Sequence, residues 1–164
     1  MYTLEIDLYY KGEKQETIRK NIGFRRIDIH NNSLFVNNKQ VKLRGVARHD
    51  ISPYFGRAIP DSAYLLRDIQ LLRQGNCNFI RTSHYPADEY LMDLCDRYGI
   101  FVENEAPVCW DRDRDPKTNS VEHAEVLFYG FKSLIYRDRT HPSVLTWSIA
   151  NESLWVLAFT LVIY

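Results

Sequence analysis

The alternation of short apolar runs with helix-like segments after residue 41 constrains the fold more than any other feature of this chain. The apolar runs are residues 41–46, 77–82, 100–102 and 144–149, and the helix-like segments are 61–75, 88–98 and 121–137. One strand-helix unit about every 30 residues is typical of parallel α/β structure, and an eight-unit barrel of roughly 250 residues has the same spacing. The sequence therefore predicts an α/β fold with about the first four strands of a (β/α)8 TIM barrel.

Local signals support the first helix. Asp61 or Ser62 can cap its N-terminus, and Leu65, Ile69 and Leu72 recur at the spacing of one helix face. The later apolar run 144–149 carries no charge, as expected of a strand buried on both faces of a parallel sheet.

Residues 1–30 have a different pattern. Residues 2–10 alternate apolar and polar side chains, Gly12 interrupts them, and a second stretch runs through 25–29. This pattern predicts two or three antiparallel strands with one solvated face, resembling the last strands of a β-sandwich. We expect this domain to end near residue 30, half of a barrel to span 31–155, and an apolar tail to occupy 156–164.

Composition excludes several functional classes. The 164 residues contain 21 lysines and arginines against 21 aspartates and glutamates, so bulk charge does not favour nucleic acid or an acidic membrane as partner. Three cysteines without CxxC spacing imply no disulfide framework. No secretory signal is apparent at the N-terminus, which favours the cytoplasm, and the eleven apolar residues at 154–164 fall short of the roughly 20 that span a bilayer.

Polar residues follow each of the four predicted strands. They are Arg48-His49-Asp50, Ser83-His84-Tyr85, Asn104-Glu105 and Asn151-Glu152. Any one of them alone is explained by a strand-end hydrogen bond or a helix cap. In a barrel, however, the four strand ends meet at one mouth, where active sites lie, so four successive clusters favour function. Glu152 is the first candidate for a catalytic group.

Three ordered motifs carry a family resemblance. NFIRTSHYP at 78–86 with CDRYGI at 95–100 resembles the first signature of glycoside hydrolase family 2, and RDRTHPSV through WSIANES, within 137–153, resembles the second. RGVARHD at 44–50 is similar to the family's first barrel strand. The resemblance implies a retaining β-glycosidase on a (β/α)8 barrel that follows an immunoglobulin-like sandwich. β-Galactosidases are the most similar group, and β-glucuronidases are the alternative.

The resemblance also implies roles for residues after the fourth strand. Glu152 matches the general acid/base, which protonates the leaving oxygen and then activates water. Asn151 would bind the sugar 2-hydroxyl. Trp147 lies in mid-strand and is predicted to be core, whereas Trp110 and Trp155 lie in loops and are candidates for stacking on a pyranose.

Further roles fall on the earlier strand ends. His49 and His84 would line the sugar pocket, and Glu105 would belong to the pocket or its supporting shell. Arg81 would hold the carboxylates in place through charge-assisted hydrogen bonds.

Two departures from the family pattern concern the chemistry. The family's nucleophilic glutamate lies on a later barrel strand, for which the chain has no counterpart after Trp155. Some β-galactosidases bind magnesium through a Glu-Thr-His run after the third strand, where this chain has Cys109-Trp110-Asp111. We therefore expect no cofactor, no metal, and no turnover by this chain alone.

The expected partner is a β-linked sugar, and a homo-oligomer is the expected form of the full-length enzyme. Two other interpretations remain open at this stage. The chain could serve as a carbohydrate-binding or interaction module, or it could be a non-functional gene fragment.

Overall fold

The computed structural model describes residues 1–57, 61–110 and 120–153. In chain order its strands and helices are β1 (Tyr2–Tyr10), β2 (Glu13–Ile22), β3 (Ile27–His30), β4 (Ser33–Val36), β5 (Lys39–Val41), β6 (Gly45–Arg48), α1 (Ser62–Gln74), β7 (Phe79–Thr82), α2 (Glu89–Tyr98), β8 (Phe101–Glu105), α3 (Val121–Asp138) and β9 (Val144–Ser148). The predicted alternation of strands and helices after residue 41 is confirmed.

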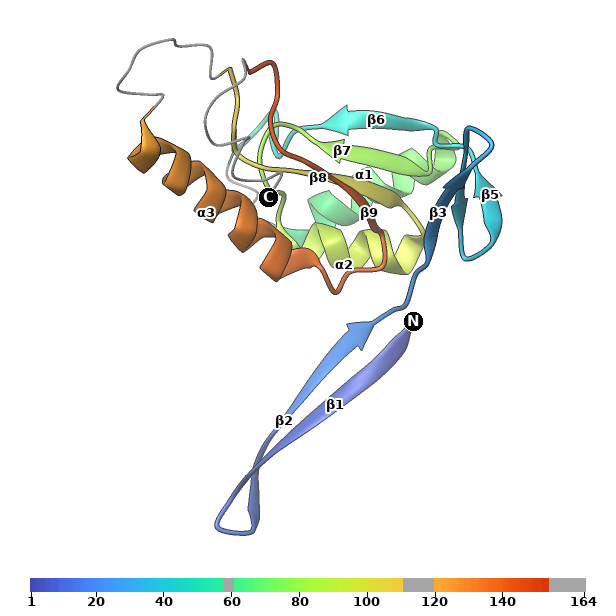
Figure 1. Cartoon of the computed structure of the whole chain (residues 1–164). Helices are drawn as coiled ribbons and strands as arrows, with labels where there is room; N and C mark the ends of the chain where they lie inside the picture. The colour runs from blue at the N-terminus through green and yellow to red at the C-terminus, as the bar shows by residue number, and fades with distance from the viewer. Residues whose placement is uncertain (58–60, 111–119, 154–164) are drawn as a thin grey trace.

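Four parallel strands in the order β6-β7-β8-β9 form the central sheet. The helices that connect them lie together on one face of the sheet (Figure 1). Because every crossover returns the chain to the same end of the sheet, the carboxyl ends of the four strands lie along one edge.

Polar caps start each helix where the sequence places them. Asp61 accepts a hydrogen bond from the backbone N–H of Ala63 at 2.8 Å, and Asp88 accepts one from Tyr90 at 2.8 Å. Gly99 ends α2 in the left-handed conformation, with φ of 67°, which glycine adopts without steric cost. The predicted start of the first helix is therefore confirmed at Ser62.

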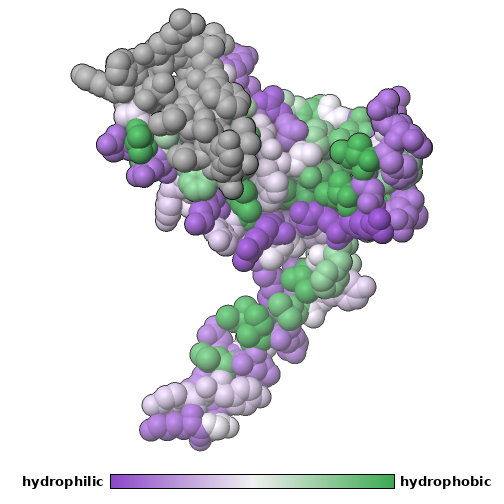
Figure 2. All heavy atoms as spheres, viewed as in Figure 1, coloured by the Kyte–Doolittle hydropathy of each residue, from purple (hydrophilic) through white to green (hydrophobic). Residues whose placement is uncertain are grey.

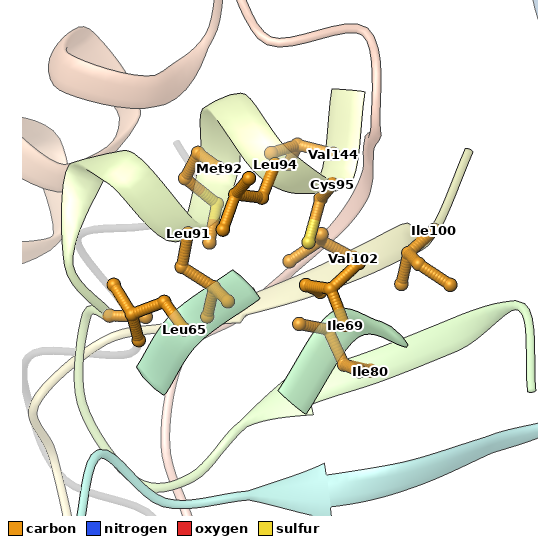
Figure 3. Close-up of a cluster of buried hydrophobic side chains, with 11 residues drawn as sticks. Leu65, Ile69, Ile80, Leu91, Met92, Leu94, Cys95, Ile100, Val102 and Val144 are labelled. Carbon is orange, nitrogen blue, oxygen red and sulfur yellow. The ribbon is translucent and has the colours of Figure 1, made fainter. Parts of the chain in front are cut away.

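The main core lies between the sheet and the helices α1 and α2 (Figure 3). The side chains of Ile80 on β7, Val102 on β8 and Val144 on β9 are fully enclosed. Each such aliphatic side chain contributes about 1.5–3 kcal/mol when it leaves water. Trp147 packs against this cluster and against a second cluster beneath α3, so the prediction that it belongs to the core is confirmed.

Two predicted strands have different boundaries. The run expected at 41–46 is divided: Val41 ends β5, and β6 begins only at Gly45. The side chain of Asn78 interrupts the strand, since its Oδ1 accepts from the backbone N–H of Arg44 at 2.7 Å and its Nδ2 donates to the carbonyl of Lys42 at 3.0 Å. A side chain takes over the backbone hydrogen bonds that a continuous ladder would make.

The third strand is longer than the apolar run 100–102. β8 extends through Asn104 and Glu105, both of which are 0% exposed. Polar side chains can occupy this buried position because each has hydrogen-bond partners within the fold.

The N-terminal strands form two separate sheets. β1 and β2 make an antiparallel hairpin that projects from the rest of the described chain (Figure 1). Apolar side chains of β1, among them Ile6 and Leu8, are exposed along it (Figure 2). β3, β4 and β5 form a second antiparallel sheet, so the expected domain division after residue 30 falls between two hydrogen-bonded strands. An immunoglobulin-like sandwich at 1–30 stays a prediction.

Among the described helices, none combines the length and the apolar character that crossing a bilayer requires. The predicted tail at 156–164 lies outside the described residues.

Candidate active site

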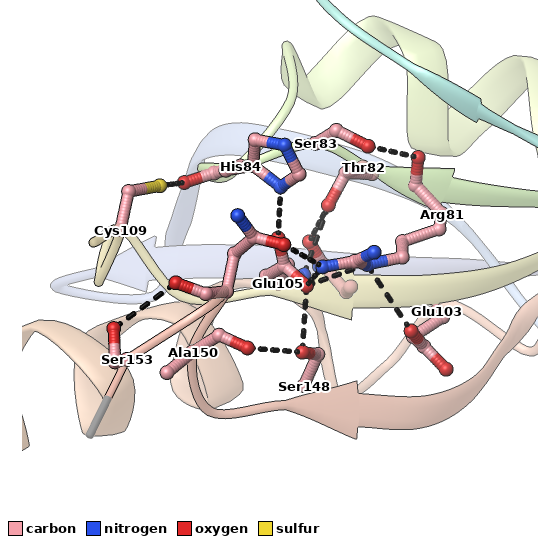
Figure 4. A network of polar contacts seen from close by, with 12 residues as sticks. Arg81, Thr82, Ser83, His84, Glu103, Glu105, Cys109, Ser148, Ala150 and Ser153 are labelled. Atoms are coloured by element: carbon pink, nitrogen blue, oxygen red, sulfur yellow. Dashed lines mark hydrogen bonds and ion pairs between the residues drawn. The ribbon is translucent and has the colours of Figure 1, made fainter. Parts of the chain in front are cut away.

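Arg81 lies at the centre of a polar network at the carboxyl edge of the sheet (Figure 4). Its Nε donates to Glu105 Oε2 at 2.6 Å, and its Nη2 donates to Asn151 Oδ1 at 2.8 Å. Glu103 lies 3.5 Å from the same guanidinium. The arginine thus joins the ends of β7 and β8 to the loop after β9, and the expected contact between Arg81 and a site carboxylate is present.

Glu105 forms the floor of this network. Besides Arg81, its carboxylate has His84 Nδ1 at 2.8 Å and Ser148 Oγ at 2.7 Å as partners. The side chain is 0% exposed. The burial of Glu105 and its three polar partners favour a place in the supporting shell over one in the pocket, and this role stays a prediction.

Asn151 presents one unused donor. The residue is 6% exposed, and its Oδ1 is occupied by Arg81. Its Nδ2 is buried and, within the described residues, has no hydrogen-bond partner. Since buried polar atoms normally find partners, this amide nitrogen is a candidate for binding a ligand oxygen.

Glu152 follows Asn151 directly and is exposed. Its backbone is left-handed, with φ of 47°, and its Oε2 accepts a hydrogen bond of 3.1 Å from the indole Nε1 of Trp110. The candidate acid/base therefore lies at the accessible side of the network. The other proposed stacking residue, Trp155, lies outside the described residues.

The two predicted pocket histidines are adjacent. The rings of His49 and His84 are 5.0 Å apart in an edge-on arrangement, and the ring of Trp110 lies 5.9 Å from His84. His49 is exposed, whereas the His84 side chain is only 17% exposed and contacts Glu105. Residues from three different strand ends therefore gather as predicted, and their roles toward a sugar stay predictions.

The sequence did not predict a second network of hydrogen-bonded polar side chains next to the site. Asn104 Nδ2 donates to Asp138 Oδ2 at 2.6 Å, and Thr82 Oγ1 lies 3.3 Å from Asn104 Oδ1. Thr82 Oγ1 also accepts the backbone N–H of Glu105 at 2.9 Å. Asp138 is 0% exposed and pairs with Arg137. A buried aspartate in the last turn of α3 thus fixes the position of the carboxyl end of β8.

Two residues of the segment that replaces the magnesium-binding run, Cys109 and Trp110, offer no oxygen side chain, and the third, Asp111, lies outside the described residues. Cys109 Sγ lies 3.0 Å from the carbonyl oxygen of His84, to which the thiol donates. Burial and the negative charge of Glu105 raise the pKa of this thiol. The indole of Trp110 is a donor and offers no lone pair to a cation. Magnesium takes oxygen ligands, so these residues do not fit it, and the described residues contain no cluster of three or more candidate metal ligands.

The arrangement combines an accessible carboxyl group, an unpaired amide donor beside it, and two imidazoles at the open edge of a parallel α/β sheet. This combination suits a hydrolase that protonates a leaving group while it binds a polyhydroxylated substrate. The fold and site thus define a parallel α/β domain of barrel type with polar side chains gathered at the carboxyl ends of its strands.

The chain belongs to glycoside hydrolase family 2. Residues 27–163 match the family described as "Glycosyl hydrolases family 2, TIM barrel domain". This match confirms the resemblance inferred from the three sequence motifs.

Individual relatives fall into two groups. The chain is 35% identical over 163 residues to a β-galactosidase of Priestia megaterium and 38% identical over 139 residues to one of Alteromonas mediterranea. These alignments cover 93% and 80% of this chain but only 16% and 13% of the relatives. Among solved structures, a β-glucuronidase of Ruminococcus gnavus in complex with uronic deoxynojirimycin superimposes with a TM-score of 0.82 at 28% identity, covering 93% of this chain and 26% of that one.

A second solved structure gives the same result. The β-glucuronidase of Bifidobacterium dentium complexed with coumarin-3-O-glucuronide has a TM-score of 0.81 at 29% identity, covering 91% of this chain and 24% of that one. The chain therefore spans a small part of the length of the relatives it matches.

Proposed function

We propose that this chain carries the acid/base half of a retaining β-galactosidase site, with Glu152 as the proton donor. The observation that carries the proposal is the buried Nδ2 of Asn151, next to Glu152, which has no hydrogen-bond partner among the described residues. A sugar hydroxyl in this position would satisfy the amide and bring the glycosidic bond beside the carboxyl group.

The chemistry has two steps. In the first, protonated Glu152 gives its proton to the glycosidic oxygen while the bond from that oxygen to the anomeric carbon breaks and a second carboxylate of the complete site bonds to that carbon. In the second, the carboxylate of Glu152 takes a proton from water as the water oxygen bonds to the anomeric carbon and the bond from that carbon to the second carboxylate breaks. The amide of Asn151 donates to the 2-hydroxyl throughout, and this contact strengthens as the ring approaches an oxocarbenium ion.

The other site residues hold the Asn151 amide in place or line the side where the sugar would bind. Arg81 fixes the oxygen of the Asn151 amide, so that the nitrogen is left to face the sugar. Glu105 anchors both Arg81 and His84. His49 lines the accessible side, where the sugar ring would lie against it.

Alone, this chain is proposed to lack turnover. A retaining mechanism needs a second carboxylate about 5–5.5 Å from the acid/base, free to attack the anomeric carbon. Glu105 is unsuited to that role because it is buried and bonded to Arg81, His84 and Ser148. Binding without hydrolysis is therefore the expected behaviour.

The substrate class is tested by binding. We expect galactose-configured deoxynojirimycin to bind the chain more tightly than uronic deoxynojirimycin in isothermal titration calorimetry, as β-galactosidase relatives suggest. The β-glucuronidase structures support the alternative order. Asn151→Ala should weaken binding about tenfold or more, because it removes one hydrogen bond to the ligand. Thr17→Ala, on the distant hairpin, is the matched control.

Turnover is measured in parallel with nitrophenyl β-galactoside. No release of nitrophenol by the purified chain is the expected result. Release that disappears in Glu152→Gln would contradict the proposed inactivity while supporting the acid/base role. Absence of binding by either iminosugar would overturn the proposed site.

A non-catalytic binding module is the second candidate. It is favoured by the pairing of an unused amide donor with neighbouring aromatic rings, which is sufficient for binding a sugar. In that case galactose, which is neutral, should bind the wild type and Glu152→Gln with equal affinity. The basic iminosugar should bind the wild type more tightly if the Glu152 carboxylate faces the ligand.

A further inference from the structure

We propose that Trp110 is a positioning residue that holds the carboxylate of Glu152 through its indole N–H, at the segment where some relatives of this family hold a magnesium ion. The inference rests on the proposed acid/base role of Glu152. In this chain a neutral side chain, through its N–H group, would orient the acid/base.

The direct observation is the hydrogen bond from Trp110 Nε1 to Glu152 Oε2, which measures 3.1 Å and joins residues 42 positions apart. Trp110 was expected to stack on a sugar. Its nitrogen edge is instead directed to the carboxylate, although 59% of the residue remains exposed.

The backbone holds the two residues in register. Cys109 and Asn151 form an isolated parallel bridge, in which the N–H of Asn151 donates to the carbonyl of Val108 at 2.8 Å. The N–H of Trp110 donates to the carbonyl of Asn151 at 3.0 Å. These bonds fix the distance between the two segments independently of the indole.

Both residues then leave the bridge with left-handed backbone. Trp110 has φ of 54° and Glu152 has φ of 47°, a region in which residues other than glycine are uncommon. Such conformations cluster at functional sites, where the surrounding structure determines them. Here they occur as a pair, and the pair is joined by the side-chain hydrogen bond.

The ring is also fixed at a second point. The Trp110 ring meets the ring of His84 edge-on at 5.9 Å, and His84 is bonded to the buried Glu105. The indole therefore links the exposed acid/base to the floor of the network.

The chemical consequence concerns the proton. An indole N–H can only donate, so Glu152 Oε2 must accept from it in both protonation states. This hydrogen bond therefore favours the acid form that carries its proton on Oε1. A neutral donor orients the carboxyl group in this way without the full positive charge that a metal ion would bring.

The test uses the complete chain and the indole N–H signals in ¹⁵N–¹H NMR spectra. The sequence contains three tryptophans, and Trp110→Phe identifies the signal of Trp110 by its loss. We expect Glu152→Ala to shift this signal, while that of Trp147, in the core, stays in place. Acidification should move the Trp110 signal further in the wild type than in Glu152→Ala, because the neighbouring His84 ring is present in both.

Binding provides the second readout. Trp110→Phe should weaken galactose-configured deoxynojirimycin about tenfold, and Trp110→His, which restores a ring N–H, should recover part of the loss. An indole signal that ignores both Glu152→Ala and acidification would overturn the inference, whatever the binding result. If that signal responds but no iminosugar binds, the hydrogen bond stands and the proposed glycosidase function fails.

Discussion

Arg81 and Asn151 share a hydrogen bond of 2.8 Å, from Nη2 to Oδ1, although 70 positions of sequence separate them. The same guanidinium neutralises Glu105, whose side chain is wholly enclosed. One arginine therefore both orients the amide proposed to bind substrate and compensates the buried charge below it. Stability and ligand binding should depend on it together.

Replacing Arg81 should destabilise the folded chain. Arg81→Ala leaves the Glu105 carboxylate buried without its cation, and we expect the free energy of unfolding in urea to fall by about 3 kcal/mol. Arg19→Ala is the control, because its pairing with Glu5 on the hairpin is largely exposed and should contribute little. Equal losses in the two variants would show that Glu105 does not depend on Arg81.

The buried side chains of Asn104 and Asp138, which are hydrogen-bonded to each other, should contribute to stability cooperatively. A double-mutant cycle between Asn104→Ala and Asp138→Ala should give a coupling energy of about 1–2 kcal/mol, because the two buried side chains satisfy each other at 2.6 Å. The pair Glu103 and Thr146 is exposed and 3.3 Å apart, so the same cycle there should give a coupling close to zero. Additive effects of Asn104→Ala and Asp138→Ala would contradict cooperativity between these two side chains.

The close approach of β6 to β7 requires glycine at position 45. A Cβ added there would lie 2.5 Å from both the ring and the carbonyl oxygen of Phe79, so Gly45→Ala should lower the unfolding free energy by about 2 kcal/mol. Gly130→Ala is the matched control. Within α3 a Cβ at this position meets nothing within 4 Å, so alanine should stabilise the chain by roughly 0.5–1 kcal/mol. Thermal unfolding of the two variants should therefore shift in opposite directions.

The pKa of the Cys109 thiol should respond to the charged side chains of the site. Burial and then the charge of Glu105 raise its pKa, while Arg81 and Arg57 oppose that rise. Since the thiolate is the reactive form, alkylation by iodoacetamide should accelerate only at a pH above the ordinary range of thiols. Arg57→Ala removes an opposing positive charge and should move the midpoint of the rate profile further upward.

The alkylation is followed at Cys109 by mass spectrometry of the digested chain. Cys95, which is fully buried and whose pKa is raised mainly by burial, serves as the unreactive reference until the chain unfolds. A downward shift of the Cys109 midpoint in Arg57→Ala would contradict the electrostatic account.

The sequence by itself determined the secondary structure of the parallel region and most of the residues at its edge. Helix caps such as Asp61 and the apolar spacing within 61–75 are local signals, and local geometry decides them. The motifs also predicted that Arg81, His84 and Asn151 lie near one another, because parallel strands with helical crossovers must bring their carboxyl ends to the same edge.

Only the tertiary structure decided how these residues contact one another. The partner of Trp110 depends on a bridge between segments that are 42 positions apart, which no local pattern encodes. Burial likewise assigned Glu105 to the floor of the network, and register brought Asn104 against Asp138. Periodicity determines which elements form, whereas the hydrogen bonds of the site depend on how strands distant in sequence align. That alignment left the Asn151 amide with one donor to spare and directed the Trp110 indole to Glu152.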